Sequence, residues 1–467
     1  MRRRSLILSA MALSAALLTS TAADAVPGDH VRDDQPLPGY TIDNPPLDPL
    51  IVAGRPSRVL QGVHRHAAFD IEVPPRWNGG LLMWAHGFRG DTRVLTVDPP
   101  GYGLRRRLLD QGYAWAASSY YANDYDVRAG VLSTRDLADH FRRVVGKPRR
   151  TFLAGVSMGG HVTVRSLEQY PGYYDAALPL CGVLGDHELF DFFLDFHLVA
   201  QDLADVPAYP FPADYASAAV PKIQERLGLG GSGPGNELGE QFRAIVVNLG
   251  GGERPGADAA FAYWKDFLFG LAGPAGDGTL AQEPGRVATN LDTSYRPDSP
   301  VNVDATVQRV PPEDPVARRT SRLTAVPTVS GRIDVPVLSL HNLGDNFVPF
   351  SMEQHYRADV SRHGRGGLLV QRAIRAVGHC EFSDAEVGAA WDDLVRWERG
   401  GPRPAGDDVT DAATVSNPDY GCRFTDPDAW PTGTRPLFAA CPAQGETGIR
   451  VAPDPARPST SGAAVRP

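Results

Sequence analysis

Residues 153–162 read LAGVSMGGHV and place Ser157 between Gly155 and Gly159. With 49 glycines among 467 residues, this spacing arises by chance often enough that its surroundings must decide its meaning. The preceding residues, TFLAGV, predict a buried strand, and residues 159–170 predict a helix. A sharp strand-to-helix turn needs small residues beside the serine, because a Cβ there would collide with the strand or the helix. We therefore expect Ser157 to present an exposed hydroxyl above a sheet; the alternative is a serine that caps the helix.

Strand-like and helix-like segments alternate around this motif. Apolar runs that predict strands lie at residues 79–86 (GGLLMWAH), 114–120 (AWAASSY) and 175–183 (DAALPLCGV). Between them, two groups of residues form helical faces: Leu104, Leu108, Leu109 and Tyr113, then Leu137, Phe141, Val144 and Val145. Continuous apolar strands separated by amphipathic helices are typical of a mostly parallel sheet with helices on both faces. The sequence therefore predicts the α/β class.

The alternation then stops for about 150 residues. This stretch begins with LFDFFLDFHLVA, in which five apolar residues share one helical face: Leu189, Phe192, Phe193, Phe196 and Val199. A second aromatic cluster, FAYWKDFLF, lies at residues 261–269. The content of aromatic residues is too high for a linker, so we interpret the stretch as a large cap inserted into the α/β core.

The α/β pattern resumes with predicted strands at residues 335–343 and 368–377 and a last helix that opens with a capping box at Ser383 and Glu386. After Gly400 the chain is rich in proline and glycine. These changes predict the following organisation: signal peptide 1–25, N-terminal extension 26–60, core 61–184, cap 185–330, core 331–400 and tail 401–467.

The first 25 residues have the pattern of a secretory signal peptide. Three arginines precede an apolar run and small residues that end in Ala23-Asp24-Ala25, with cleavage expected after Ala25. The alternative is an anchoring helix, but the apolar run is short for a bilayer. Cleavage removes three arginines and one aspartate, which changes the net charge from −9 to −11. A secreted acidic protein is a poor candidate for binding nucleic acid or an anionic membrane.

Two residues further along the chain complete a possible catalytic set with Ser157. A serine hydroxyl is a weak nucleophile and needs a base that a carboxylate orients. Asp345, in HNLGDNFVP, follows the predicted strand at 335–343, and His379, in AVGHCEF, follows the one at 368–377. Ligands bind at the carboxyl ends of the strands in open α/β sheets. The order Ser157, Asp345, His379 therefore predicts a catalytic triad.

Three other histidines lie close to these segments in the sequence. His86 follows an earlier strand, His161 lies on the helix after the serine, and His341 lies within a strand. His86 is an alternative base, which we disfavour because it precedes the serine on the oxyanion loop. We expect His161 and His341 to be packed rather than to react. Should Asp345 not be the acid, Asp186 near the preceding strand end is the next candidate.

The oxyanion that forms during attack by Ser157 needs backbone N–H donors. Met158, at the start of the following helix, is expected to supply one. The loop after the first central strand, WAHGFRG, places Phe88 behind His86-Gly87, and we expect the second donor there. Loss of one such donor typically raises the barrier by ~3 kcal/mol.

The motifs HGF, GVSMGG, GDNFVP and GH, in this order and spacing, resemble the α/β-hydrolase superfamily over about residues 60–185 and 330–400. The resemblance implies an α/β-hydrolase fold and these roles: Ser157 as nucleophile, His379 as base, Asp345 as acid, and Phe88 and Met158 as oxyanion donors. It leaves the substrate open, because this fold hosts esterases, lipases, peptidases, peroxidases and lyases.

Four cysteines in an exported chain are compatible with two disulfides in any of three pairings: Cys181, Cys380, Cys422 and Cys441. A cysteine directly after the histidine, here Cys380 after His379, resembles the secreted tannase and feruloyl-esterase group. In that group the cysteine is bridged to one beside the serine. Here Val156 precedes the serine instead. We expect a Cys422–Cys441 bridge that closes a loop of about 20 residues in the tail. We expect a second bridge between Cys181 and Cys380, and the alternative is two buried thiols.

Together these features predict a secreted serine hydrolase that cleaves carboxylic esters through an acyl-enzyme. The alternatives are a secreted serine peptidase or aminopeptidase, and a catalytically inactive binding protein of the same fold. A peptidase needs a carboxylate pair in the cap to hold the substrate amine. Four acidic residues offer one, although we interpret them as a solvated helix face: Asp186, Glu188, Asp191 and Asp195.

The partner expected from this chemistry is a small-molecule ester or peptide, without a cofactor or a metal ion. Tyr120, Tyr121 and Tyr125 follow a central strand and, with the aromatic cap, suit either an apolar acyl group or a packed core. We expect neither nucleic acid nor a stable membrane anchor. The identity of the substrate, the oligomeric state and the mobility of the cap stay open.

Overall fold

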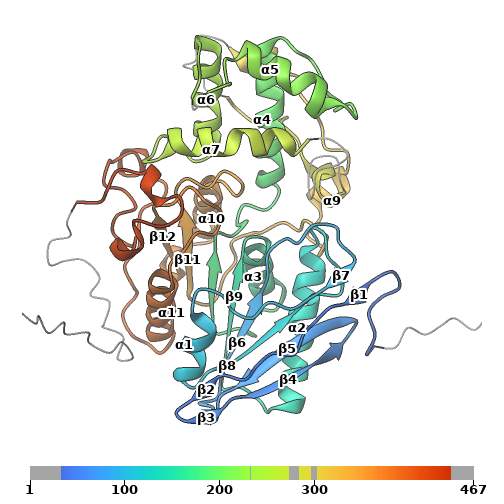
Figure 1. Cartoon of the computed structure of the whole chain (residues 1–467), viewed down its shortest axis with the longest axis vertical. Coiled ribbons are helices and arrows are strands. Elements are labelled where there is room, and N and C mark those ends of the chain that lie inside the picture. The colour runs from blue at the N-terminus through green and yellow to red at the C-terminus, as the bar shows by residue number, and fades with distance from the viewer. Residues whose placement is uncertain (1–32, 232, 273–282, 296–301, 443–467) are drawn as a thin grey trace, which may run out of the picture.

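The computed structural model describes residues 33–442, with the exception of 232, 273–282 and 296–301. The predicted signal peptide, 1–25, lies outside the described residues, as does the end of the tail from residue 443. Figure 1 shows a large sheet in the lower part of the molecule with helices packed against it, and a group of helices above the sheet.

The central sheet has eight strands in the order β12-β11-β10-β9-β6-β8-β5-β4. In chain order they are β4 (Arg58–His64), β5 (Ala67–Val73), β6 (Gly80–Ala85), β8 (Ala114–Ser118), β9 (Arg150–Val156), β10 (Ala176–Leu180), β11 (Val337–Asn342) and β12 (Leu369–Ile374). The six strands from β8 to β12 in this order are mutually parallel. Each matches an apolar run in the sequence, so the predicted α/β class is confirmed.

The antiparallel edge of the sheet is a feature that the sequence does not predict. β5 pairs antiparallel with both β4 and β8. Its sequence, AAFDIEV, contains two buried carboxylates, Asp70 and Glu72, which interrupt the apolar pattern. Glu72 accepts hydrogen bonds from Arg105 at 2.7 Å and from Trp115 at 2.9 Å. A buried charge that is paired in this way is tolerated inside a strand, although it reads as a loop residue in the sequence.

Helices cover both faces of the sheet (Figure 1). One face is packed by α1 (Leu104–Asp110) and α11 (Asp384–Glu398), with Trp391 fully buried. The other face is packed by α2 (Val127–Val144), α3 (Met158–Gln169) and α10 (Ser351–Arg362), with Phe141 and Tyr356 in its core. The capping box predicted at Ser383 and Glu386 is present at the start of α11.

The remaining small elements lie at the edges of the core. Two short ladders join β1 (Thr41–Ile42) to β7 (Val94–Leu95) and β2 (Ile51–Val52) to β3 (Arg55–Pro56). The C-terminal part contains short helical segments: η3 (Gly366–Leu368), α12 (Ala412–Val415), η4 (Pro427–Ala429) and η5 (Arg435–Leu437). Within the described residues, we find no helix with both the length and the hydropathy needed to cross a bilayer.

The segment between β10 and β11 forms the group of helices above the sheet. It contains α4 (Glu188–Ala204), η1 (Tyr215–Ala219), α5 (Val220–Arg226), α6 (Glu237–Leu249), α7 (Ala257–Gly270), η2 (Glu283–Val287), α8 (Val303–Thr306) and α9 (Pro315–Arg319). Below we call this segment the cap. α4 lies at its centre and contacts α5, α6, α7 and α8. The sequence predicts a single apolar face for α4, but the helix is buried on all sides because its neighbours surround it.

Candidate functional site

Ser157 occupies the turn between β9 and α3 in a conformation that few residues adopt. Its φ is 56° and its ψ is −123°, a strained combination for a residue with a side chain. A Cβ on Gly155 would collide with the carbonyl oxygen of Gly159, and one on Gly159 would collide with that of Ala85 on β6. The turn is therefore possible only with glycine at both positions, which is the steric reason behind the sequence pattern.

The structure brings Ser157, His379 and Asp345 together in one chain of hydrogen bonds. The Oγ of Ser157 lies 2.9 Å from Nε2 of His379, and Nδ1 of His379 lies 2.6 Å from Oδ2 of Asp345. The other carboxylate oxygen accepts the N–H groups of Phe347 and Val348, each at 3.0 Å. The serine hydroxyl is thus directed at an imidazole rather than at the helix that it precedes. An imidazole held by a buried carboxylate is the arrangement that activates a serine nucleophile.

Ser157 is more enclosed than the sequence predicts. We expect an exposed side chain, but the residue is only 9% exposed, and Asp345 is fully buried. The loop after β6 passes directly over the serine: a Cβ on Gly87 would lie 3.1 Å from that of Ser157. The turn does lift the side chain above the sheet, but neighbouring loops cover it.

The two predicted oxyanion donors belong to segments that follow neighbouring strands of the sheet, β6 and β9. Met158 is the first residue of α3, where the backbone N–H groups lack an intrahelical acceptor. Phe88 follows Gly87 on the loop after β6, and β6 pairs with β9 so that Ala85 is opposite Gly155. Both loops therefore leave the sheet next to each other, and the oxyanion role of Phe88 and Met158 stays a prediction.

The competing histidines and Asp186 are occupied elsewhere. His86 contacts two backbone carbonyl groups, and burial lowers its pKa to about 4. His161 contacts a tyrosine hydroxyl and a backbone carbonyl, and burial lowers its pKa to about 3. His341 donates from Nε2 to the carbonyl of Val348 at 2.8 Å and is fully buried. Asp186 accepts the N–H of Val329 at 2.7 Å.

Two side chains of the cap hold the loops that carry the acid and the histidine. Arg254 donates to the carbonyl of Leu343 at 2.7 Å, and burial lowers its pKa to about 10. Trp264 on α7 donates its indole N–H to the carbonyls of both Gly344, at 3.0 Å, and Val377, at 2.8 Å. The sequence marks Trp264 only as part of an aromatic cluster, because its partners lie far away along the chain. The cap therefore helps to position Asp345 and His379 in addition to covering the site.

The C-terminal segment holds the histidine loop from the opposite side. The hydroxyl of Thr434 accepts the N–H groups of Val377, at 2.7 Å, and Gly378, at 2.8 Å. The same hydroxyl donates to Glu381 at 2.6 Å. Arg375, at the end of β12, is buried and donates to backbone carbonyls of this segment, including that of Tyr420 at 2.9 Å. The tail is therefore part of the packing that fixes the histidine loop.

All four cysteines form disulfides, with the pairing that the sequence favours. Cys181 and Cys380 are joined with their Cα atoms 5.2 Å apart, and the bridge passes over the end of β11. In the register of β9 and β10, Val156 is opposite Leu180, and the N–H of Ser157 donates to the carbonyl of Leu180. Cys181 therefore stands one strand away from position 156. The bridge lies close to the serine but starts from the end of β10, whereas a cysteine at position 156 would start it from β9.

The bridge between β10 and the histidine loop also touches the imidazole. The Sγ of Cys380 lies 3.4 Å from Nε2 of His379. Together with Cys181 these groups are close enough to surround a metal ion. A cysteine binds metal as a thiolate, however, and both sulfurs are used in the disulfide. The cluster is a disulfide beside the imidazole of His379.

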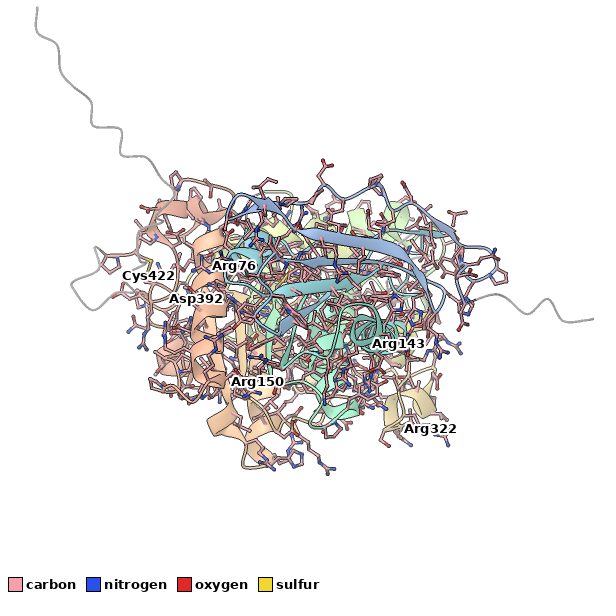
Figure 2. The ribbon with its side chains drawn as sticks, turned by 90° about the horizontal axis from the view of Figure 1, so that it is seen from below. Arg76, Arg143, Arg150, Arg322, Asp392 and Cys422 are labelled. Carbon is pink, nitrogen blue, oxygen red and sulfur yellow. A yellow bond between two sulfur atoms is a disulfide. The ribbon has the colours of Figure 1, made fainter. Side chains whose placement is uncertain are left out.

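The tail disulfide leads to a prediction about stability. Figure 2 shows Cys422 on the same side of the molecule as Asp392 of α11. Its bridge to Cys441 closes a separation of 19 residues in a segment of little regular structure. We expect the double variant Cys422→Ser/Cys441→Ser to lose about 3 kcal/mol in free energy of unfolding, because a loop of this length is freed in the unfolded chain. Denaturant unfolding measures the change, and a variant as stable as wild type would contradict it.

The acidic residues of α4 do not form the solvated face that we expect from the sequence. Asp191 is 5% exposed and binds Arg318 through both oxygens, one of them at 2.6 Å. Asp195 is 3% exposed and accepts hydrogen bonds from the hydroxyls of Tyr295 and Thr293. Segments of the cap that are distant in sequence supply these partners, which is why helical periodicity alone gives the wrong environment.

The buried carboxyl of Asp195 predicts how stability changes with pH. Burial raises its pKa from 3.8 to about 8. Between these values the folded protein holds a proton that the unfolded chain releases, so this contribution to stability is complete below about pH 4 and is lost as the pH rises through 8. We expect Asp195→Asn, which cannot titrate, to gain stability relative to wild type as the pH rises, by up to about 1.4 kcal/mol per pH unit. Urea unfolding of both proteins across this range tests it, and a difference that does not change with pH would count against it.

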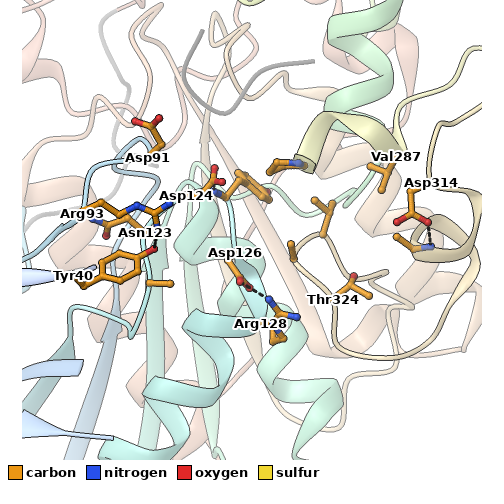
Figure 3. Close-up of a pocket in the computed structure, with 16 residues that line it drawn as sticks. Tyr40, Asp91, Arg93, Asn123, Asp124, Asp126, Arg128, Val287, Asp314 and Thr324 are labelled. Atoms are coloured by element: carbon orange, nitrogen blue, oxygen red, sulfur yellow. Dashed lines mark hydrogen bonds and ion pairs between the residues drawn. The ribbon is translucent and has the colours of Figure 1, made fainter. Parts of the chain in front are cut away.

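Tyr125 is one of the residues that line a cavity of about 450 Å³ (Figure 3). Most lining residues come from residues 91–93, 122–128 and 314–326, and they include the ion pair of Asp126 with Arg128 at 2.8 Å. The ring of Tyr125 packs against that of Phe88, with centroids 6.4 Å apart. Tyr120 and Tyr125 are buried, so they belong to the packed core that we considered as one of two possibilities.

Comparisons with known proteins give distant similarities. No family model matches the sequence. The chain is 22% identical over 449 residues to the o-phthalyl amidase of Xanthobacter agilis, which covers 79% of this chain and 96% of that protein. Among solved structures, feruloyl esterase B from Aspergillus oryzae is 12% identical, with a TM-score of 0.37 and coverage of 73% of this chain and 79% of that one. Acylaminoacyl peptidase from Pyrococcus horikoshii is 12% identical, with a TM-score of 0.35, and covers 74% of this chain but only 39% of its own.

The fold is recognised from the molecule itself. Six parallel strands in the order found here carry the serine turn after β9, the acid after β11 and the histidine after β12. β5, which runs antiparallel to both of its neighbours, and β4 complete the sheet on the side away from the histidine. With its strand order, its glycine-flanked serine turn and the chain order Ser157, Asp345, His379, the protein has the α/β-hydrolase fold.

Proposed function

We propose that the protein is a serine hydrolase that cleaves carboxylic esters through an acyl-enzyme. The observation that carries the proposal is the unbroken chain of hydrogen bonds from Ser157 through His379 to Asp345. A catalytically inactive protein of this fold has no need to keep a strained serine, an oriented imidazole and a buried acid in register. The complete set therefore favours an enzyme over the inactive alternative.

Acylation follows from the positions of these groups. As the Oγ of Ser157 bonds to the carbonyl carbon of the ester, Nε2 of His379 takes its proton and Asp345 stabilises the resulting imidazolium. The carbonyl oxygen becomes an oxyanion, and in this proposal the N–H groups of Phe88 and Met158 stabilise it. His379 then gives the proton to the alkoxy oxygen as the carbon–oxygen bond breaks. The alcohol leaves, and the acyl group stays on Ser157.

Deacylation repeats the sequence with water. His379 takes a proton from water as the water oxygen attacks the acyl carbon, and it returns that proton to Oγ of Ser157 as the acyl–serine bond breaks. The carboxylic acid leaves and the enzyme is restored. Protons and electron pairs balance within the triad, the substrate and one water molecule.

The peptidase alternative loses the carboxylates on which it depends. Residues on a helix follow at about 100° each, so Asp191 and Asp195 lie on the side of α4 opposite to Phe193. Phe193 stacks on Phe347, whose ring contacts His379. The acidic side chains thus turn away from the triad and bind groups of the cap, such as Arg318. They are not placed to hold the amine of a substrate at the serine.

Amide hydrolysis is a second candidate, favoured by the similarity to an o-phthalyl amidase over most of both chains. The same acyl-enzyme chemistry applies, with His379 protonating a leaving nitrogen instead of an oxygen. The two candidates differ only in the leaving group.

A panel of substrates tests the proposal and separates these candidates. Wild type and Ser157→Ala would be assayed with p-nitrophenyl esters, with p-nitroanilides of the same acids and with aminoacyl nitroanilides. We expect wild type to cleave the esters and to react with a fluorophosphonate probe at Ser157. Cleavage of anilides alone would favour the amidase candidate, and the absence of both cleavage and probe labelling would refute a serine hydrolase.

We also propose that the protein is exported. The pattern of residues 1–25 supports export, and so do two disulfides, which persist in oxidising compartments. N-terminal sequencing of protein recovered from the culture medium tests both export and the cleavage site after Ala25.

A further inference from the structure

Four aromatic side chains form a continuous series that starts at the catalytic imidazole; we call it the aromatic platform, and it consists of Tyr263, Trp264, Phe267 and Phe347. The ring of Phe347 lies 5.1 Å from that of His379. From there the centroid distances are 4.9 Å to Phe267, 5.3 Å on to Trp264 and 5.1 Å on to Tyr263. Tyr263, Trp264 and Phe267 share a face of α7 (Ala257–Gly270), because Phe267 is three positions from Trp264 and four from Tyr263.

The outer end of the platform is open to solvent. Phe267 is 42% exposed and Tyr263 is 51% exposed. Among the large exposed apolar side chains of the described residues, these two are the only aromatic ones, and they are one helical turn apart. The ring of Phe267 connects to that of His379 through Phe347. Exposed aromatic rings next to a site mark a surface that binds something apolar.

The platform is also held in place. The indole N–H of Trp264 bonds to the loops that carry Asp345 and His379. Phe347 belongs to the same turn as Asp345 and is stacked from behind by Phe193, with centroids 6.1 Å apart. A surface whose rings are fixed before binding loses little conformational entropy when a ligand docks.

The chemistry of the triad decides which part of a substrate meets this surface. His379 must protonate the leaving group, so the leaving oxygen lies beside the imidazole when its bond to the acyl carbon breaks. The oxyanion donors, Phe88 and Met158, belong to other loops, those after β6 and β9. The platform extends outward from His379, and it therefore adjoins the alcohol part of an ester.

We propose that the aromatic platform is the leaving-group subsite and that it selects esters of aromatic alcohols, such as benzyl and phenyl esters. This rests on the proposed function, because a leaving group exists only if Ser157 is acylated. Ring-to-ring contacts at Phe267 and Phe347 supply the selectivity, since aromatic pairs attract beyond the effect of buried area.

The test compares two acetates that differ in the alcohol with a benzoate that differs in the acyl group. Kinetics would be measured for ethyl acetate, benzyl acetate and ethyl benzoate with wild type, Phe267→Ala, Phe267→Leu and Ile51→Ala. Ile51 is 57% exposed on β2, at the end of the molecule away from the cap (Figure 1), and serves as the matched control. Phe267→Leu keeps an apolar side chain of similar volume, which protects the test against a loss of folding in the alanine variant.

We expect Phe267→Ala to lower kcat/KM for benzyl acetate by about five- to tenfold, the size of one aromatic contact, and to leave ethyl acetate and ethyl benzoate nearly unchanged. Phe267→Leu should lose part of the same preference, and Ile51→Ala should match wild type. Hydrolysis of the acetyl-enzyme, which is common to both acetates, should proceed at the wild-type rate in every variant.

Three outcomes would overturn the proposal. An equal loss for benzyl and ethyl acetate would show that the platform does not recognise the alcohol. A loss confined to ethyl benzoate would assign the platform to the acyl group instead. If wild type cleaves no ester or amide and Ser157 does not react with a fluorophosphonate, the proposed function fails and this inference fails with it. If wild type hydrolyses esters but either of the first two results is found, only the proposed subsite is refuted.

Discussion

Replacing Ser157 with alanine is expected to lower kcat by about a millionfold, as loss of the serine does in serine proteases, while the protein stays folded. In the proposed mechanism the Oγ atom is the group that bonds to the substrate, and its hydrogen bond is made to His379. Alanine keeps the Cβ in the glycine-flanked turn and adds no volume there. The expected measurement is turnover of any ester that wild type cleaves, with unfolding curves of both proteins as the control for folding.

Two controls exclude unfolding and contamination by wild type as causes of the measured turnover. The Ser157→Ala variant should have the unfolding midpoint of wild type or a higher one, because alanine takes the same strained φ of 56° and makes no new contact. Trace contamination by wild type is measured with the fluorophosphonate probe, which alanine cannot bind. Undiminished turnover by a variant that shows no probe labelling would mean that a different nucleophile acts.

Replacing Asp345 with asparagine is expected to lower kcat by about 10⁴. One carboxylate oxygen of Asp345 accepts the N–H groups of Phe347 and Val348, so the oxygen of an asparagine will take this position and its NH₂ will face His379. Nδ1 of His379 must then accept a hydrogen bond, which leaves the proton on Nε2. An imidazole in this tautomer cannot take the proton of Ser157, and its cation is no longer paired.

Asp195→Asn is the matched control for this change, because it makes the same replacement at a buried acid of the cap that contacts Tyr295 and Thr293. We expect it to keep the kcat of wild type. A loss of similar size in both variants would point to a general effect on folding. If Asp345→Asn keeps its activity, the acid lies elsewhere; Asp186, the next candidate from the sequence, is bonded to the N–H of Val329 and would have to move.

The parallel half of the sheet was predictable because its strands are buried on both faces. Such strands must be apolar throughout, so runs like TFLAGV and VPVLSLHNL stand out from the amphipathic helices around them. The antiparallel β5 is not predicted in this way, because it contains two carboxylates, Asp70 and Glu72, that are buried by pairing with polar partners. The chain neighbours of a strand show its pattern, but they do not show which distant residue neutralises a charge.

The cap was recognised as an insertion, whereas the environment of its residues was not. Asp191 and Asp195 read as the polar face of an amphipathic helix, because the sequence shows only the helix itself. In the structure, α4 is enclosed by the rest of the cap. Tyr295 is 100 positions from Asp195, and Arg318 is 127 positions from Asp191. Burial of a charged side chain depends on such partners, which become known only from packing.

By itself, the sequence determined the turn at Ser157 and the order of the three reacting groups. The turn depends on local sterics, because it needs Gly155 and Gly159 within two positions of the serine. Five neighbouring residues and the strand and helix pattern around them are therefore enough to predict it. Tertiary structure alone decided that His379, 222 positions away, meets Ser157 at 2.9 Å and that Trp264 of the cap fastens the loops of the acid and the base. These contacts depend on which strands lie side by side, a choice made by the packing of the whole core, where each local segment is compatible with more than one neighbour.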